Sequence, residues 1–262
     1  MLTRKMLLNT TCFAVACFMT SVMADELNDQ QPSLTVGIGV QNAPKYSGSD
    51  DSRIQFAPVV QARNGAFFFD SLKGVGYDLQ NSKGLYLEHT IGYGLGRKDR
   101  DSSWREGSDK LKGMGNIKAT INTSVAVGWY ASSWFSLEGK AILPLTDSQG
   151  AQYQTSVTLL PWQDDKDTVS LQSAALFGDA RYMETMYGVN DKQSEASGYA
   201  SYQASGGFYG VKTDLTWSHQ FSSNWSTAVS GGYTWLGDHA ADSPIVQRRN
   251  QTTVSAGVLY TF

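Results

Sequence analysis

Apolar and polar residues alternate along most of this chain with a period of two. Along 252–262 every second residue from Val254 onward is apolar or aromatic, and the residues between them are small or polar except Leu259. The same alternation runs through 34–41, 116–130, 207–221 and 225–235. A period of two predicts β-strands that have one face in an apolar medium and the other in a polar interior.

Short and long connections alternate between these strands, as in outer-membrane barrels with short periplasmic turns and longer outer loops. Long connections are expected at 97–115, 178–205 and 237–250. Counting back from the terminal strand gives eleven segments, whereas a barrel with both termini in the periplasm needs an even number. Division of 66–80 at Ser71–Gly74 resolves this. The pattern therefore predicts an antiparallel transmembrane β-barrel of twelve strands, with ten as the alternative. Short turns are expected at Asn81–Gly84, Ala131–Ser133, Gln163–Lys166 and Ser222–Asn224.

The amino-terminal segment has the composition of a secretory signal peptide. Arg4 and Lys5 precede an apolar run, and small residues stand before Asp25, which predicts a cleaved signal at 1–24 and a barrel domain at 25–262. Cys12 and Cys17 both lie inside that signal, which excludes a disulfide scaffold or a thiol catalyst in the mature chain.

Composition and charge agree with a barrel. The mean hydropathy is −0.31, which a strand protein with a polar lumen tolerates because only alternate residues face lipid. The formal charge is −3 and becomes −5 (−3 − 2) without Arg4 and Lys5, which gives no support to nucleic-acid binding. Five tryptophans stand near expected strand ends, where interfacial girdles belong: Trp129, Trp134, Trp162, Trp225 and Trp235.

Six charged residues fall on the inward face of the expected strands. Three are acidic and three basic, so they either pair and fill the lumen or sit in lumen water, and the sequence leaves both alternatives open. They are Glu88, Lys118, Glu138, Lys140, Lys212 and Asp214.

Sequence patterns for catalysis, cofactors or metals are weak. His239 follows Asp238 and precedes Asp242 near the outer end of an expected strand, where an Asp–His pair would activate water or serine. Adjacent strand residues point to opposite faces, however, so we expect no enzyme activity. Glycine clusters lie within strands rather than before a helix, and no loop has calcium-site spacing. No catalytic residue, cofactor or metal is therefore expected.

Three loops carry short motifs: Pro44, Tyr46 and Gly48; Tyr187, Gly188 and Val189; and Asp242, Ser243, Pro244 and Val246. In this order and at these spacings the motifs resemble those of the MipA/OmpV family of outer-membrane proteins (MltA-interacting proteins). The resemblance spans about Leu34 to Phe262, and Met186 replaces the first tyrosine of the family's Y-Y-G-V segment. The terminal strand, with Tyr260 and Phe262, is similar to those that bacterial outer-membrane barrels present to the barrel-assembly machinery.

The resemblance implies an exported, non-enzymatic barrel embedded in outer-membrane lipid. It further implies a scaffold that brings a lytic transglycosylase and a murein synthase together in cell-wall growth. A small-solute channel or antibiotic-responsive porin is the alternative, and an outer-membrane hydrolase around Asp238 and His239 is a third hypothesis. Turns of three or four residues offer little surface to a partner, because a specific complex buries roughly 800 Å² on each side.

Overall fold

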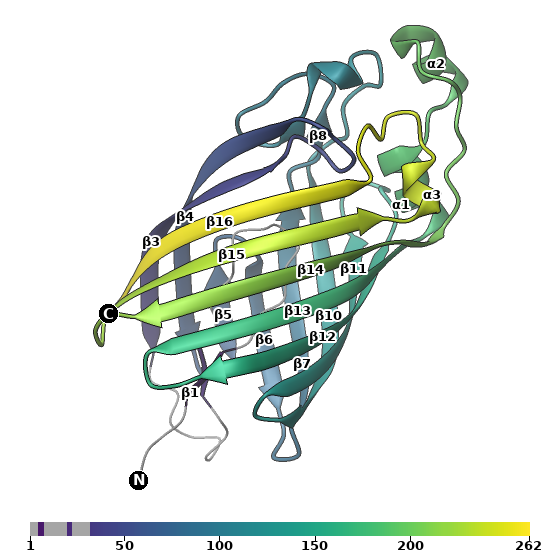
Figure 1. Cartoon of the computed structure of the whole chain (residues 1–262). Helices are drawn as coiled ribbons and strands as arrows, with labels where there is room; N and C mark the ends of the chain where they lie inside the picture. Colours follow the sequence, from purple (N-terminus) through teal and green to yellow (C-terminus); the bar gives the residue numbers. More distant parts are fainter. Residues whose placement is uncertain (1–4, 8–19, 23–31) are drawn as a thin grey trace.

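The computed structural model describes residues 5–7, 20–22 and 32–262, and its main body is a closed antiparallel barrel (Figure 1). Twelve strands form the barrel, as the sequence predicts, and β7 pairs with β10 while β16 pairs with β3 to close the wall. The strands are β3 (Ser33–Pro44), β4 (Ser52–Asn64), β5 (Phe67–Asp70), β6 (Gly74–Gln80), β7 (Leu85–Gly94), β10 (Thr120–Ser132), β11 (Phe135–Pro144), β12 (Gln152–Gln163), β13 (Asp167–Gly178), β14 (Gly207–Gln220), β15 (Trp225–Leu236) and β16 (Asn250–Thr261).

Smaller elements lie outside the wall. None of the helices in the described part of the chain is long and apolar enough to cross a membrane. The predicted signal peptide at 1–24 falls largely outside the described residues. The remaining elements are β1 (Lys5–Leu7), β2 (Thr20–Val22), β8 (Arg97–Lys98), β9 (Glu106–Gly107), the 3₁₀ turn at Asp109–Leu111, α1 (Ala180–Tyr187), α2 (Asp191–Ser197) and α3 (Asp238–Ala241).

Side-chain exposure follows the alternation of the sequence. Along β10, for example, Ser124 and Ala126 are buried toward the lumen, while Val125 and Val127 are exposed on the outer surface. The outer surface is apolar because each strand presents every second residue to lipid, and the barrel leaves no terminal edge in its strand order. The division of 66–80 at Ser71–Gly74 is also confirmed, since β5 ends at Asp70 and β6 begins at Gly74.

One outward assignment is wrong. The alternation along 207–221 places Tyr209 toward lipid, but the register of β13 and β14 shifts between Leu176 and Phe177. This irregularity turns Phe208 outward and Tyr209 inward, where Tyr209 is 7% exposed. As a result, Tyr209 packs beneath α1.

The inward-facing Leu259 has a clear packing role. It is buried together with Val59 from β4, and Leu72 from the turn between β5 and β6 packs against both. These three side chains form an apolar cluster inside a lumen that is otherwise lined mainly by polar residues.

Aromatic side chains mark the periplasmic end of the wall. Trp217 donates its indole N–H to Asp167 at 2.8 Å, and Trp162 donates to Asp164 at 3.0 Å. His219 also contacts Asp167, with Nδ1 to Oδ1 at 2.9 Å. Amphipathic rings that hold a polar group at the turns and an apolar body beside the wall are typical of a membrane interface.

Candidate functional site

The three sequence motifs meet at the outer end of the barrel, although about 200 residues separate the first from the last. Tyr46, in the β3–β4 loop, is fully buried and donates its hydroxyl proton to the carbonyl of Ile245 at 2.9 Å. Ser47 Oγ lies 2.8 Å from the hydroxyl of Tyr187, and Ser243 donates to the carbonyl of Tyr187 at 2.5 Å. We call this meeting point of the 44–48, 187–189 and 242–246 loops the outer junction.

Gly48 is required for the loops to approach so closely. Its φ of 100° lies in the region that favours glycine, and a Cβ built there would be 2.7 Å from Cγ2 of Val246. The carbonyl of Gly48 also accepts from the backbone N–H groups of Gln247 and Arg248 at 2.7 and 2.9 Å. This glycine therefore joins the first motif to the third by backbone contact.

The remaining motif residues have supporting places in the junction. Val189 exchanges two backbone hydrogen bonds with Tyr202, at 2.8 and 2.9 Å, which ties the segment after α1 to the segment after α2. Val189 and Ile245 are buried with Tyr46, Leu111 and Met114 in one apolar cluster. The other motif residues flank these contacts: Gly188 caps α1, Pro44 ends β3, and Pro244 and the exposed Asp242 border Ser243.

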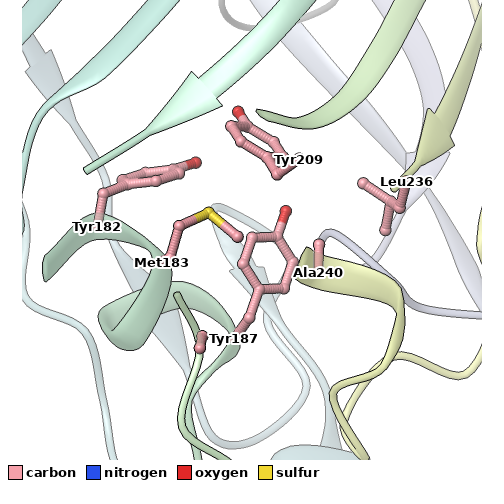
Figure 2. Close-up of a cluster of buried hydrophobic side chains, with 7 residues drawn as sticks. Tyr182, Met183, Tyr187, Tyr209, Leu236 and Ala240 are labelled. Carbon is pink, nitrogen blue, oxygen red and sulfur yellow. The ribbon is translucent and has the colours of Figure 1, made fainter. Parts of the chain in front are cut away.

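A second apolar cluster packs α1 against the upper barrel wall. Figure 2 shows Met183 and Tyr187 of α1 beside Tyr209 of β14 and Ala240 of α3. The Tyr187 and Tyr209 ring centroids are 5.9 Å apart. Because Met183 is fully buried and Tyr187 is 1% exposed, α1 is held firmly at the outer end rather than standing free in solvent.

A buried arginine links the junction to the long loop after β7. Arg97 is 3% exposed, donates to the carbonyl of Met186 at 2.7 Å and lies over the Tyr46 ring at 6.0 Å. Burial raises the pKa of the nearby Glu106 carboxyl, although the positive charges of Arg97 and Arg53 act in the opposite direction. Burial also raises the pKa of Tyr187 to about 12. The alternation of the strands gave no indication of Arg97 or Glu106, because neither lies on a transmembrane strand.

The six charges expected in the lumen have different environments. Lys212 and Asp214 pair at 3.0 Å on β14, whereas Glu88 pairs at 3.2 Å with Lys73 of the β5–β6 turn, which is not one of the six. Glu138 accepts from the hydroxyl of Tyr86 at 2.7 Å. Lys140 is half-buried on the inner face of β11.

Lys118 is the one expected lumen charge that lies outside the strands. It is exposed between the isolated bridge at Ile117 and the start of β10 at Thr120. The prediction was wrong because the alternating stretch 116–130 begins four residues before the hydrogen-bonded strand. A further pair was missed: Arg63 on β4 makes two hydrogen bonds to Asp78 on β6, at 2.9 and 2.6 Å. Lys212 and Asp214 lie on one strand, whereas the pair of Arg63 and Asp78 spans β5 between their two strands.

The expected assembly residues lie at the periplasmic end. Tyr260 packs against Trp225 with ring centroids 5.0 Å apart, and Phe262 packs against Tyr260 at 4.9 Å. Phe262 is 70% exposed, which leaves its ring accessible at the end of the terminal strand.

Asp238 and His239 do not form a catalytic pair in this arrangement. Asp238 contacts Arg249, while Nδ1 of His239 lies 3.3 Å from the hydroxyl of Ser205, and both side chains are exposed. Among the described residues, no group of three or more potential ligands could hold a metal ion. Asp50 and Asp51 instead contact Lys110, and Asp101 contacts Lys45.

Comparison with known proteins identifies the family. The family model described as "MltA-interacting protein MipA" matches residues 36–262. This chain belongs to that family. It is 26% identical over 231 residues to the "MltA-interacting protein" of Escherichia coli strain K12, covering 88% of this chain and 90% of the relative. It is 30% identical over 166 residues to "Outer membrane protein OmpV" of Vibrio cholerae, covering 60% of each.

The fold is also that of known outer-membrane proteins. The crystal structure of the COG4313 outer membrane channel from Pseudomonas putida F1 has a TM-score of 0.50 at 10% identity, covering 88% of this chain and 95% of the channel. The MipA-family chain described here is therefore a β-barrel of the bacterial outer membrane.

Proposed function

We propose that this MipA-family chain is a non-enzymatic scaffold whose outer mouth is closed by its own loops and whose periplasmic rim binds a murein-processing enzyme. The outer junction carries the proposal. Tyr46 and Ile245 are fully buried there, and Tyr187 is 1% exposed, so the outer loops pack on one another instead of leaving the mouth open. A barrel closed in this way is suited to holding a partner rather than to passing solutes.

The name of the relatives supports the choice of partner. Two of them, from Escherichia coli and Shigella flexneri, are called MltA-interacting proteins. For the present chain we propose a lytic transglycosylase as the first partner and a murein synthase as the second. Both classes of enzyme act on the cell wall, which lies on the periplasmic side of the barrel.

The periplasmic rim offers an aromatic and charged surface. Trp134, Trp162 and Phe221 are each about 60% exposed at the ends of the short turns. Lys83 and Lys166 are exposed beside them. No single turn supplies the roughly 800 Å² that a stable interface buries on each side, so several turns must contribute together.

Binding of a purified lytic transglycosylase to the barrel in detergent tests the scaffold proposal. The double variant Lys83→Glu/Lys166→Glu should weaken binding at least tenfold, since it reverses charge at two turns of the rim, one on each side of the β10–β11 turn. Lys192→Glu, on the exposed outer helix α2, is the matched control and should leave binding unchanged. Equal binding by all three proteins, or none by the wild type, contradicts the proposal.

Planar-bilayer recording distinguishes the scaffold from a small-solute channel. A closed outer junction predicts little steady conductance from the wild-type barrel. A stable conductance of porin size would replace the scaffold proposal with the channel hypothesis. Hydrolysis that disappears in His239→Ala would instead favour the hydrolase hypothesis.

A further inference from the structure

The β5–β6 hairpin is too short to cross the membrane. β5 has 4 residues and β6 has 7, while the strands on either side, β4 and β7, have 13 and 10. A tilted strand needs roughly 9–11 residues to cross the hydrocarbon. From these lengths we infer that the tip of this hairpin, Ser71–Lys73, ends inside the membrane.

Above the tip, one edge of β4 has no strand beside it. β4 pairs with β3 along Ser52–Arg63, but with β5 only along Gln61–Asn64. Ser71 then occupies the next position, exchanging hydrogen bonds with Val60 at 2.9 and 3.0 Å. Beyond it, no ladder in the described part of the chain joins 52–59 to β7, so the wall has a lateral opening in its outer half.

Pro58 is a sequence marker of this edge. Its carbonyl accepts from Ser71 Oγ at 3.2 Å, so its backbone polar groups face the opening rather than β3. Proline has no N–H to donate, and for that reason it occurs in sheets at edges rather than in central strands. A proline in the middle of a transmembrane strand fits a position where no neighbouring strand needs its N–H.

The hairpin tip satisfies its own polar groups, as a turn at membrane depth must. Asp70 Oδ1 accepts from the backbone N–H groups of Leu72 and Lys73 at 2.7 and 3.2 Å. Tyr93 donates to the carbonyl of Ser71 at 2.5 Å, and the ammonium of Lys73 turns inward to Glu88. These contacts hold the hairpin tip in a defined position at the lower border of the opening.

Apolar side chains border the lateral opening on both the outer and the inner side of the wall. On the outer surface, Ile54 and Phe56 are 66% and 69% exposed beside the free edge. On the inner side, directly behind the tip, stand Val59, Leu72 and Leu259 in their apolar cluster. A hydrocarbon chain that passed above the tip would leave the lipid and reach this cluster by passing the free edge of β4.

Arg53 lies at the upper border, on the inward face of β4. Its Nη1 donates to the carbonyl of Ser102 at 3.1 Å and to that of Arg105. Its Nε is buried and has no hydrogen-bond partner among the described residues, even though Glu106 is close enough to interact electrostatically. A buried donor of this kind is costly unless something accepts from it.

We propose that the lateral opening between β4 and β7 binds a single-chain amphiphile from the outer leaflet. Its hydrocarbon chain lies against Val59, Leu72 and Leu259, and its anionic headgroup accepts from Arg53. The occupant is a lipid-derived chain, because hydrocarbon is what surrounds the wall at the depth of the tip. This binding is separate from the proposed contact with a murein enzyme at the periplasmic rim.

Photolabelling of the wild-type barrel in phospholipid vesicles tests the proposal. The probe is palmitic acid that carries a diazirine near the end of its chain, and labelled residues are located by mass spectrometry. We expect at least tenfold more label on Val59, Leu72 and Leu259 than on Ala126, Ala174 and Ala228, which are lumen-facing behind full-length strands. Label confined to outward-facing residues overturns the proposal.

Two comparisons sharpen the experiment. The methyl ester of the same probe should label the cluster several-fold less than the acid, because it lacks the anionic carboxylate that accepts hydrogen bonds from Arg53; equal labelling overturns the assignment of the headgroup. Lengthening the β5–β6 hairpin by three residues in each strand should reduce labelling to that of the alanines. The same insertion in the β10–β11 hairpin, at the Ser133–Trp134 turn, is the control and should have no effect. Undiminished labelling in a folded barrel with the lengthened hairpin contradicts the proposed route.

Discussion

Gly48→Ala should open the outer junction while leaving the barrel wall intact. A residue with a side chain is strained at a φ of 100°, at a cost of about 1–3 kcal/mol. The new Cβ would also lie 2.7 Å from Cγ2 and 3.1 Å from Cα of Val246. Val246 is β-branched and cannot rotate away freely, so overpacking adds about 1–3 kcal/mol.

The two contributions together amount to about 2–6 kcal/mol against the packed junction. Since every 1.4 kcal/mol is a factor of ten, the loops should open at least about thirtyfold more often. Protease added to vesicles that expose the outer face measures this, because cleavage of a transiently opened segment follows the opening equilibrium. We expect faster cleavage within the 242–249 segment and an unchanged barrel by heat-modifiability on gels.

Gly115→Ala is the matched control for this experiment. Gly115 also has a positive φ, 77°, but a Cβ there would have no neighbour within 4 Å. The control therefore carries the backbone strain without the collision, in another outer loop. If Gly48→Ala and Gly115→Ala accelerate cleavage of 242–249 equally, or neither does, the close approach of the loops does not hold the junction closed.

The other predictions concern the wall, the lumen and the buried acid. Leu215→Arg, outward on β14, should cost about 2–4 kcal/mol in urea unfolding from vesicles, whereas the inward Thr216→Arg should cost less; equal costs contradict the register. Lys212→Gln should cost less than about 1 kcal/mol, because its partly exposed pair with Asp214 is screened, and should change conductance little if the mouth is closed. Burial raises the pKa of Glu106, so above the ordinary value of 4.5 the folded junction binds more protons than the opened one. Closure should therefore weaken as pH rises from about 4.5 toward that raised pKa, and Glu106→Gln should remove this dependence of proteolysis on pH.

Much of the wall was predictable because a strand repeats every two residues. Val254 and Val258 fall on the lipid face by counting alone, and the even strand number required by the two termini divided 66–80 at the correct turn. The same counting failed at Tyr209, where one register shift reverses the two faces. It also failed at Lys118, where alternation continues past the hydrogen-bonded strand.

The outer junction was not predictable by periodicity. Its contacts join residues as distant as Tyr46 and Ile245, and loops carry no repeat that would show which of them meet. The three motifs indicated the important segments, but not that Ser243 and Ser47 both contact Tyr187. Arg97 and Glu106 were missed for the same reason, since a buried charge in a loop looks like a solvated one in sequence.

The outer junction and the proposed lateral opening are different parts of the barrel. We therefore infer that ion passage and the access of lipid chains are governed separately. We propose that the outer junction closes the axial route by packing loops, whereas the proposed opening beside Pro58 follows from the short β5. Among the described residues, the junction contacts named above do not involve the hairpin tip. Opening the loops with Gly48→Ala should therefore raise conductance without increasing photolabelling of Leu72. Lengthening the hairpin should reverse this result, lowering the label at Leu72 in a barrel whose conductance stays low. Conductance and labelling that changed together in both variants would mean that one gate serves both routes, and would contradict the separation of the junction from the lateral opening.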